Sequence, residues 1–112
     1  MNIFKNKIAL ITGHTGFKGS WLAVWLESLG AQVVGVALDP PSQPSHFEVA
    51  GISEILEDNR VDIRNIEALK GLVSQTQPDF VFHLAAQALV RQSCDEPVAT
   101  YNTNAIGTLN LL

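Results

Sequence analysis

Residues 12–19 read TGHTGFKG, a glycine-rich string that follows an apolar run and precedes a helical pattern. Its glycines, Gly13, Gly16 and Gly19, are spaced GxxGxxG. In a strand-to-helix loop, the first permits a tight turn, the second lets the backbone approach a pyrophosphate, and the third lets the helix pack closely on the sheet. The N–H groups that begin such a helix would then face the phosphates. The string therefore predicts a dinucleotide-binding loop, with a purely structural glycine turn as the alternative.

A phosphate-binding P-loop is the main competing interpretation of the same string. That motif is GxxxxGK[ST], which requires a second glycine five residues after the first. Lys18 occupies that position here. The P-loop is therefore excluded.

The segments around the glycine string alternate between strand and helix patterns. Residues 8–12 and 32–38 are apolar runs typical of buried strands. Between them, apolar residues recur at helical spacing over residues 21–29, and Gly30 follows where a C-terminal glycine cap belongs. This unit is long enough for its two strands to pair in parallel, and apolar strands of this kind suit a sheet covered on both faces.

The rest of the chain continues the alternation. Residues 40–48 are rich in turn residues and predict a loop, and residues 54–57 are interpreted as a short third strand. A helix is expected over residues 65–77, a buried strand over residues 80–84, and a last helix from about Pro97 to the end of the chain. The order β-α-β-(β)-α-β-α predicts a doubly wound parallel α/β sheet of the Rossmann type.

Two acidic positions follow strands of this predicted sheet. Asp39 follows the second strand, where a carboxylate accepts the ribose hydroxyls of the adenosine half and repels a 2′-phosphate. No Arg or Lys lies near Asp39 in the sequence, so NAD is favoured over NADP. The alternative is that Asp39 only begins the turn at Pro40 and Pro41. Asp62 and Ile63 lie where the loop after the third strand would meet adenine.

The end of the sequence bears on domain organisation. The chain stops at residues 109–112 (LNLL), within an apolar helical pattern that has no cap and no polar tail. A doubly wound dinucleotide fold needs two halves, and only the first half and the start of the second are present. We therefore expect residues 1–112 to be the N-terminal part of an NAD-binding Rossmann-type domain, incomplete at the C-terminus. Its last helix and sheet edge should leave apolar surface uncovered.

Composition excludes several other classes of function. Seven Lys and Arg against eleven Asp and Glu give a formal net charge of −4, and no basic cluster points to nucleic acid or an anionic membrane as a partner. No apolar run is long enough to span a bilayer, and no signal peptide is evident. Cys94, the only cysteine, has no obvious base partner and forms no disulfide framework, so a cytoplasmic protein is expected.

The remaining polar and aromatic residues indicate no second mechanism. His14, His46 and His83 lack metal-ligand spacing, and His83 is interpreted as a strand-end histidine whose hydrogen bonds are satisfied. Trp21 and Trp25 lie one helical turn apart and are expected in the core rather than in a ligand platform.

Five strings carry a family resemblance: TGHTGFKGSWL at residues 12–22, ALDPP at 37–41, VDIRN at 61–65, VFHLAAQALVR at 81–91 and TNAIGTLNLL at 103–112. Together they resemble the extended short-chain dehydrogenase/reductase superfamily. Within it they most resemble the CDP-glucose 4,6-dehydratases, mainly through HTGFKGSW and LDPP.

The resemblance implies roles for residues around a bound NAD. The glycine loop would surround the pyrophosphate, Asp39 would bind the adenosine ribose, and Asp62 and Ile63 would meet adenine. Residues 84–86 would line the path to the nicotinamide ribose, and Asn104 would brace the strand ends. The implied cofactor-binding residues are Gly13, Thr15, Gly16, Phe17, Gly19, Asp39, Asp62, Ile63, Leu84, Ala85, Ala86 and Asn104. Gln87 and Arg91 would face the sugar nucleotide, with a solvated cation as the alternative for Arg91.

The resemblance also implies a reaction for the complete enzyme. NAD would oxidise the sugar at C4, water would be eliminated across C5 and C6, and the hydride would return to C6, giving CDP-4-keto-6-deoxyglucose from CDP-glucose. This product is a precursor of deoxysugars in bacterial surface polysaccharide. The complete enzyme is expected to be a homo-oligomer.

The superfamily's catalytic Tyr-x-x-x-Lys pair is absent. Tyr101 is the only tyrosine, and Ala105 stands four residues after it. We therefore assign no catalytic residue to these 112 residues, and we expect the isolated chain to be inactive. Two alternatives stay open: another NAD(P)-dependent nucleotide-sugar epimerase or reductase, and a module that binds a dinucleotide or a protein partner without doing chemistry.

Overall fold

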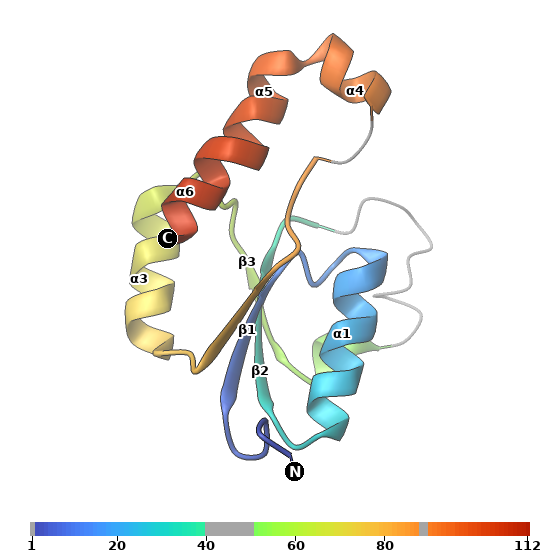
Figure 1. Ribbon diagram of the computed structural model, residues 1–112, viewed down its shortest axis with the longest axis vertical. Helices are drawn as coiled ribbons and strands as arrows, with labels where there is room; N and C mark the ends of the chain where they lie inside the picture. Colours follow the sequence, from blue (N-terminus) through green and yellow to red (C-terminus); the bar gives the residue numbers. More distant parts are fainter. Residues whose placement is uncertain (1, 40–50, 88–89) are drawn as a thin grey trace.

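The computed structural model describes residues 2–39, 51–87 and 90–112. Its centre is a four-stranded parallel sheet in the order β3-β2-β1-β4 (Figure 1). The chain winds outward from β1 to β3 and then crosses to the other side of β1, which is the topology of a doubly wound sheet. The expected fold class is therefore confirmed. The strands are β1 (Ile8–Thr12), β2 (Gln32–Ala37), β3 (Glu57–Arg60) and β4 (Phe80–His83).

Helices cover both faces of the sheet. Helix α1 (Phe17–Ser28) lies on one face, and α3 (Ile66–Thr76) lies on the other, beside α6 (Gly107–Leu111) (Figure 1). Alternate residues of β1 supply the two cores, because Ala9 and Ile11 belong to the cluster with α1 and Leu10 belongs to the cluster with α3. This two-sided burial explains why β1 reads as an unbroken apolar run.

Helix α1 presents small residues to the sheet rather than its tryptophans. Trp21 is 53% exposed and Trp25 is 64% exposed, so the expectation that they lie in the core is wrong. They occupy the side of α1 opposite its buried residues, because a face of small side chains lets the helix approach the sheet closely. The buried residues of α1 are Gly19, Ser20, Ala23 and Leu26.

The third strand lies further along the chain than expected. Residues 52–54 form a short 3-10 helix, η1 (Ile52–Glu54), with Ile52 fully buried, and the strand covers Glu57–Arg60 instead of residues 54–57. Its sequence, EDNR, has low strand propensity. The strand forms because it pairs with β2 in parallel register, with Val34 opposite Glu57 and Ala37 opposite Arg60. A charged strand is also common at a sheet edge.

Strand β4 is confirmed in position but not in burial. It pairs only with β1 among the described residues, and its side chains are half-buried or exposed. Helix α3 is confirmed, with the Asn65 side chain accepting a hydrogen bond from the Ala68 N–H at 3.2 Å. Gly30 ends α1 with a φ of +88°, as its position predicts.

The C-terminal part is helical from Pro97, as expected, but it is not uniform. Helix α5 (Pro97–Tyr101) continues through a π-helical turn, η2 (Asn102–Ile106), into α6. A short helix not foreseen from the sequence, α4 (Val90–Asp95), precedes it. The loop expected at residues 40–48 lies outside the described residues. Within the described part, no helix is long and apolar enough to cross a membrane.

Candidate dinucleotide-binding site

A cavity lies at the carboxyl ends of the strands, between the glycine loop and the segments that follow β2, β3 and β4. In open α/β sheets this edge binds ligands at the point where the strand order reverses, which here is between β1 and β4. The cavity is lined by Gly13, Thr15, Gly16, Ala37, Leu38, Asp39, Val61, Asp62, Ile63, Leu84, Ala85, Ala86 and Thr103.

Most residues singled out from the sequence as cofactor ligands lie in this lining. Three do not: Phe17 is exposed, Gly19 is buried under the loop, and Asn104 contacts Gln87 instead. Four lining residues were not expected from the sequence. All four lie within two residues of Asp39, Asp62 or Asn104 along the chain, and this adjacency is the only signal for them in the sequence. The four are Ala37, Leu38, Val61 and Thr103.

Two glycines of the loop have no room for a side chain. Gly13 has a φ of +84°, and a Cβ there would lie 2.8 Å from the Ala85 backbone nitrogen. A Cβ on Gly19 would lie 2.1 Å from the Gly13 carbonyl oxygen. Gly16 differs, because its backbone is extended and a Cβ would make only an ordinary 3.5 Å contact. Gly13 and Gly19 are thus required by packing, whereas Gly16 leaves bare backbone in the cavity wall.

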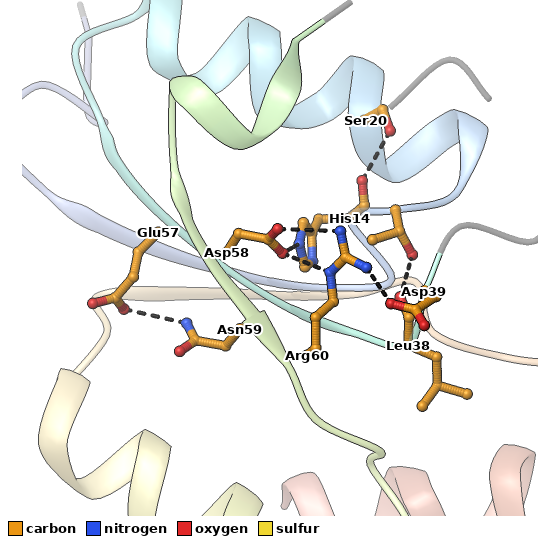
Figure 2. Close-up of polar contacts among 9 residues, drawn as sticks. His14, Ser20, Leu38, Asp39, Glu57, Asp58, Asn59 and Arg60 are labelled. Atoms are coloured by element: carbon orange, nitrogen blue, oxygen red, sulfur yellow. Dashed lines mark hydrogen bonds and ion pairs between the residues drawn. The ribbon is translucent and has the colours of Figure 1, made fainter. Parts of the chain in front are cut away.

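Hydrogen bonds to β2 and α1 fix the loop to its surroundings. The Gly13 N–H donates to the Val36 carbonyl at 2.8 Å. The Thr15 hydroxyl donates to the Leu38 carbonyl at 2.9 Å, which joins the loop to the end of β2. The buried Ser20 hydroxyl donates to the His14 carbonyl at 2.8 Å (Figure 2). The loop is therefore held in shape from β2 and from α1.

Asp39 has an arginine beside it, contrary to the expectation from the sequence. Arg60, at the end of β3, donates from Nη1 to Oδ1 of Asp39 (Figure 2). The same guanidinium binds both carboxylate oxygens of Asp58, from Nε at 3.0 Å and from Nη2 at 3.2 Å. Parallel pairing of β2 with β3 brings Arg60 next to the end of β2, 21 residues away along the chain. No Arg or Lys lies near Asp39 along the sequence, but the fold brings Arg60 into contact with it.

His14 anchors this cluster from the interior. Its ring is fully buried, and its Nε2 lies 2.6 Å from Oδ1 of Asp58 (Figure 2). The ring packs on Gly35, where a Cβ would lie 2.4 Å from it. Burial lowers the pKa of His14 despite the neighbouring carboxylate. Burial raises the pKa of Asp58, but hydrogen bonds from Arg60 and His14 outweigh it, so the net shift is downward and the carboxylate is ionised near neutral pH.

Asp62, on the opposite wall, is paired with Arg64. The Arg64 side chain donates to Asp62 Oδ2 from Nε at 2.9 Å and from Nη2 at 2.6 Å. The Arg64 backbone N–H also donates to Asp62 Oδ1 at 2.9 Å. These hydrogen bonds lower the pKa of Asp62. The next residue, Ile63, is buried and supplies an apolar surface next to this carboxylate.

His83 connects the end of β4 to the C-terminal helix. Its Nδ1 lies 2.6 Å from the Thr12 hydroxyl, and its Nε2 lies 2.7 Å from the Thr108 hydroxyl. The expectation of a strand-end histidine with satisfied hydrogen bonds is therefore met. Burial lowers the pKa of His83. Thr12 and Thr108 position this ring, and the sequence carries no signal for either because only the tertiary fold brings them to it.

Asn104 and Gln87 form a second connection. The Asn104 side chain accepts from the Gln87 N–H at 2.7 Å and donates to the Gln87 carbonyl at 2.9 Å. The Gln87 amide donates to the Thr100 hydroxyl at 3.1 Å. Helices α5 and η2 thus hold the segment that follows β4, next to Ala85 and Ala86. Arg91 lies on α4 and is exposed, outside the cavity lining.

The residues present fit a dinucleotide. Bare backbone at Gly16 and the N-terminus of the 12-residue α1 suit a pyrophosphate, which helix N–H groups and the helix dipole favour. A carboxylate at the end of β2 suits ribose hydroxyls, and the apolar Ile63 suits a base. Tyr101 and Cys94 are exposed and outside this lining. Among the described residues, no three His, Cys, Asp or Glu side chains group as metal ligands.

Comparison with known proteins identifies the family. A sequence model for the family described as GDP-mannose 4,6 dehydratase matches residues 10–112, which is nearly the whole chain. The chain belongs to the GDP-mannose 4,6-dehydratase family. Its relatives include a GDP-mannose 4,6-dehydratase and a CDP-glucose 4,6-dehydratase. Both of these relatives are nucleotide-sugar 4,6-dehydratases.

One curated relative is similar over almost the whole chain. The CDP-glucose 4,6-dehydratase of Salmonella typhimurium strain LT2 is 48% identical over 111 residues, which is 99% of this chain and 31% of that enzyme. The chain thus spans about a third of the length of the relatives it matches.

Solved structures agree with the family fold. The UDP-glucose 4-epimerase of Thermotoga maritima superposes with a TM-score of 0.80 at 33% identity, covering 93% of this chain and 32% of that protein. The UDP-glucose 4-epimerase of Thermus thermophilus, solved in complex with NAD, gives a TM-score of 0.78 at 31% identity, again over 93% of this chain and 32% of the other. This 4,6-dehydratase family member therefore shares its fold with NAD-binding epimerases.

Proposed function

We propose that this chain forms the NAD-binding part of a nucleotide-sugar 4,6-dehydratase that acts on CDP-glucose. The observation that carries the proposal is the cavity at the carboxyl ends of the strands. It brings together the glycine loop, two carboxylates after β2 and β3, and the segment after β4. A Cβ would have room at Gly16, so packing does not require glycine there, and bare backbone in the cavity wall favours a ligand-binding loop over a purely structural turn.

Each wall of the cavity has a separate role in this proposal. The N–H groups that begin α1 bind the pyrophosphate, and the bare backbone at Gly16 lets it approach the loop. Asp39 accepts hydrogen bonds from the adenosine ribose, and Ile63 packs against the base beside Asp62. When bound, NAD supplies the hydride acceptor and donor of the reaction.

The segment after β4 has a positioning role. Residues 84–86 form one wall of the cavity on the side of the nicotinamide ribose, and Gln87 faces the sugar nucleotide in this proposal. Asn104 holds the backbone of Gln87 at both its N–H and its carbonyl. Proton transfer is assigned to no residue of this chain, because Tyr101 lacks a lysine four positions later.

The choice of CDP-glucose rests on similarity. The 48% identical relative is named for this substrate, whereas a GDP-mannose 4,6-dehydratase from Yersinia enterocolitica is 36% identical. A nucleotide-sugar epimerase is the second candidate, favoured by the TM-score of 0.80 with a UDP-glucose 4-epimerase.

A glycine substitution tests the cofactor part of the proposal. In the full-length protein, Gly16→Ala should change the free energy of unfolding by less than about 1 kcal/mol, because the new Cβ has room. It should nevertheless weaken NAD binding, because the methyl group would occupy the wall of the cavity. In the unchanged protein, NAD at a hundredfold excess over its Kd should raise the free energy of unfolding by about 2.7 kcal/mol.

The control is Gly71→Ala, on the exposed side of α3, where a Cβ meets nothing within 4 Å. This variant should bind NAD as the unchanged protein does. Thermal melts with and without NAD measure how much NAD stabilises each variant. Turnover of CDP-glucose, GDP-mannose and UDP-glucose by the unchanged protein identifies the substrate. The proposal is contradicted if the unchanged full-length protein shows no shift with NAD, or if Gly16→Ala and Gly71→Ala bind NAD equally well.

A further inference from the structure

The imidazole of His14 lies under the glycine loop and packs on the sheet. His14 stands between Gly13 and Thr15, which line the cavity, but it is fully buried and is not itself part of the lining. A Cβ at Gly35 of β2 would lie 2.4–2.6 Å from three atoms of the ring, Cγ, Nδ1 and Cδ2. The ring therefore occupies the space that a side chain at position 35 would fill.

The strand register supplies the partner of this ring. In the parallel pairing of β2 with β3, Gly35 lies opposite Asp58. An imidazole that lies over the bare Cα of Gly35 therefore reaches the next strand, and its Nε2 lies 2.6 Å from Oδ1 of Asp58 (Figure 2). Arg60 binds both oxygens of the same carboxylate, at 3.0 and 3.2 Å, and so holds it in place.

The protonation states make this contact a charge-assisted hydrogen bond. Burial lowers the pKa of His14, so the ring is neutral near neutral pH. The Asp58 carboxylate is ionised and can only accept, so the proton of the ring lies on Nε2 and is donated to it. Hydrogen bonds to a charged group are shorter and stronger than those between neutral groups.

The backbone of His14 is held from the other side, by α1. The buried Ser20 hydroxyl donates to the His14 carbonyl at 2.8 Å. A Cβ on Gly19 would lie 2.9 Å from the His14 Cα, so α1 packs directly on this part of the loop. His14 thus joins the glycine loop to β3 through its side chain and to the first turn of α1 through its backbone.

We propose that His14 is a positioning residue for the dinucleotide, because its hydrogen bond to Asp58 holds the glycine loop against the start of α1 in the geometry that binds a pyrophosphate. The inference rests on the proposed function, since it assumes that this loop binds the pyrophosphate of NAD. Hydrogen bonds from backbone N–H groups weaken steeply when the donors turn away from the acceptor. A small displacement of the loop should therefore reduce the affinity for a pyrophosphate.

Two ligands separate this role from a purely structural one. Adenosine has no phosphate, so in the proposed function it contacts only the walls formed by Asp39, Asp62 and Ile63. ADP adds the pyrophosphate and so also depends on the loop and the start of α1. Loss of the His14 hydrogen bond should weaken ADP and leave adenosine nearly unaffected, whereas general damage to the cavity should weaken both.

The experiment measures the Kd of ADP, adenosine and NAD by NMR titration of the full-length protein and its variants. His14→Leu keeps a side chain of similar size that cannot bind Asp58. It should weaken ADP and NAD by roughly tenfold or more, and adenosine by less than about threefold. His14→Gln places an amide N–H close to the position of Nε2, so it should bind ADP within about threefold of the unchanged protein.

Leu26→Ala is the control for lost stability. Leu26 is buried in α1 but lies outside the loop and the cavity lining, so this variant should be less stable and should bind ADP as the unchanged protein does. If His14→Leu does not fold, His14→Asn takes its place, because its polar side chain is one carbon shorter than that of Gln and cannot reach Asp58.

Three results would overturn the inference. The first is a variant without the hydrogen bond that binds ADP as tightly as the unchanged protein. The second is an equal weakening of ADP and adenosine, and the third is a Leu26→Ala variant that loses as much ADP affinity as His14→Leu. If the unchanged protein binds neither ADP nor NAD, the proposed function fails as well.

Discussion

The hydroxyl of Thr12 lies 2.6 Å from Nδ1 of His83, and this contact joins the end of β1 to the end of β4. The Thr12 oxygen also accepts hydrogen bonds from the backbone N–H groups of Leu84 and Ala85, at 3.0 and 3.1 Å. Because both acceptor positions of the hydroxyl are taken, its proton points to His83, and Nδ1 is the acceptor. Thr12 thereby holds the segment that forms one wall of the cavity.

The contact of the second ring nitrogen, Nε2, shows where the proton of His83 lies. The Thr108 hydroxyl donates to the Asn104 carbonyl at 2.8 Å, so it must accept from Nε2–H of His83. The network therefore assigns His83 as a neutral imidazole with its proton on Nε2. The lowered pKa that burial gives His83 agrees with this protonation state.

Replacing His83 tests this network. His83→Leu should lower the free energy of unfolding by about 1–3 kcal/mol, because the hydroxyls of Thr12 and Thr108 lose their shared partner. His83→Gln should lower it less, since an amide oxygen and an amide N–H can replace the two ring nitrogens. Urea denaturation measures the free energy of unfolding of both variants in the full-length protein. Equal losses for the two variants would show that the ring contributes through packing alone.

Acidification should destabilise the protein before its carboxylates titrate. Burial lowers the pKa of both His14 and His83, so the unfolded chain binds protons at a higher pH than the folded chain. The free energy of unfolding should therefore fall as the pH drops below 6.5, the ordinary histidine value, by at most about 1.4 kcal/mol per pH unit for each ring. Asp58 and Asp62 contribute only below their ordinary value of 3.8.

Urea titrations between about pH 7.5 and pH 5 measure this slope. The His83→Gln variant should show a shallower dependence, because one of the two titrating rings is gone. A free energy of unfolding that rises on acidification through this range would contradict the direction assigned to both histidines.

Replacing Gly19 should lower the free energy of unfolding much more than replacing Gly16. Gly19→Ala places a Cβ 2.1 Å from the Gly13 carbonyl oxygen, so the loop and α1 must move apart. We expect a loss of more than about 2 kcal/mol in the free energy of unfolding, well above the loss for Gly16→Ala. Thermal melts of both variants without ligand measure the difference. If the two variants melt alike, the close approach of α1 to the loop is not a packing requirement.

Substitution of two neighbouring residues of α1 should lower the free energy of unfolding by very different amounts. Trp25 is 64% exposed, so Trp25→Gln should change the free energy of unfolding by less than about 1 kcal/mol. Leu26 is 2% exposed in the core against the sheet, so Leu26→Ala should cost about 2–5 kcal/mol. Urea denaturation distinguishes the two. A larger loss from Trp25→Gln than from Leu26→Ala would mean that the helix faces the other way.

The elements that the sequence predicts well are those governed by local patterns. The apolar runs of β1 and β2 and the helical spacing of α3 depend on neighbouring residues, and Gly13 marks a positive φ that few other residues adopt. Asp39 and Asp62 follow neighbouring strands, and parallel strands bring their carboxyl ends to one edge of the sheet, so the pattern places these two acids near the glycine loop. Ala85 and its neighbours are implied for the same site by the family resemblance alone.

The sequence by itself therefore determined the doubly wound order, the glycine loop and the edge that carries the site. The tertiary structure decided the rest. The polar strand β3 exists because it pairs with β2, and that pairing places Arg60 beside Asp39. Trp21 and Trp25 face outward because small residues of α1 fit the sheet more closely. In each case the deciding contacts join residues far apart in the chain, and their free energy outweighs local propensity.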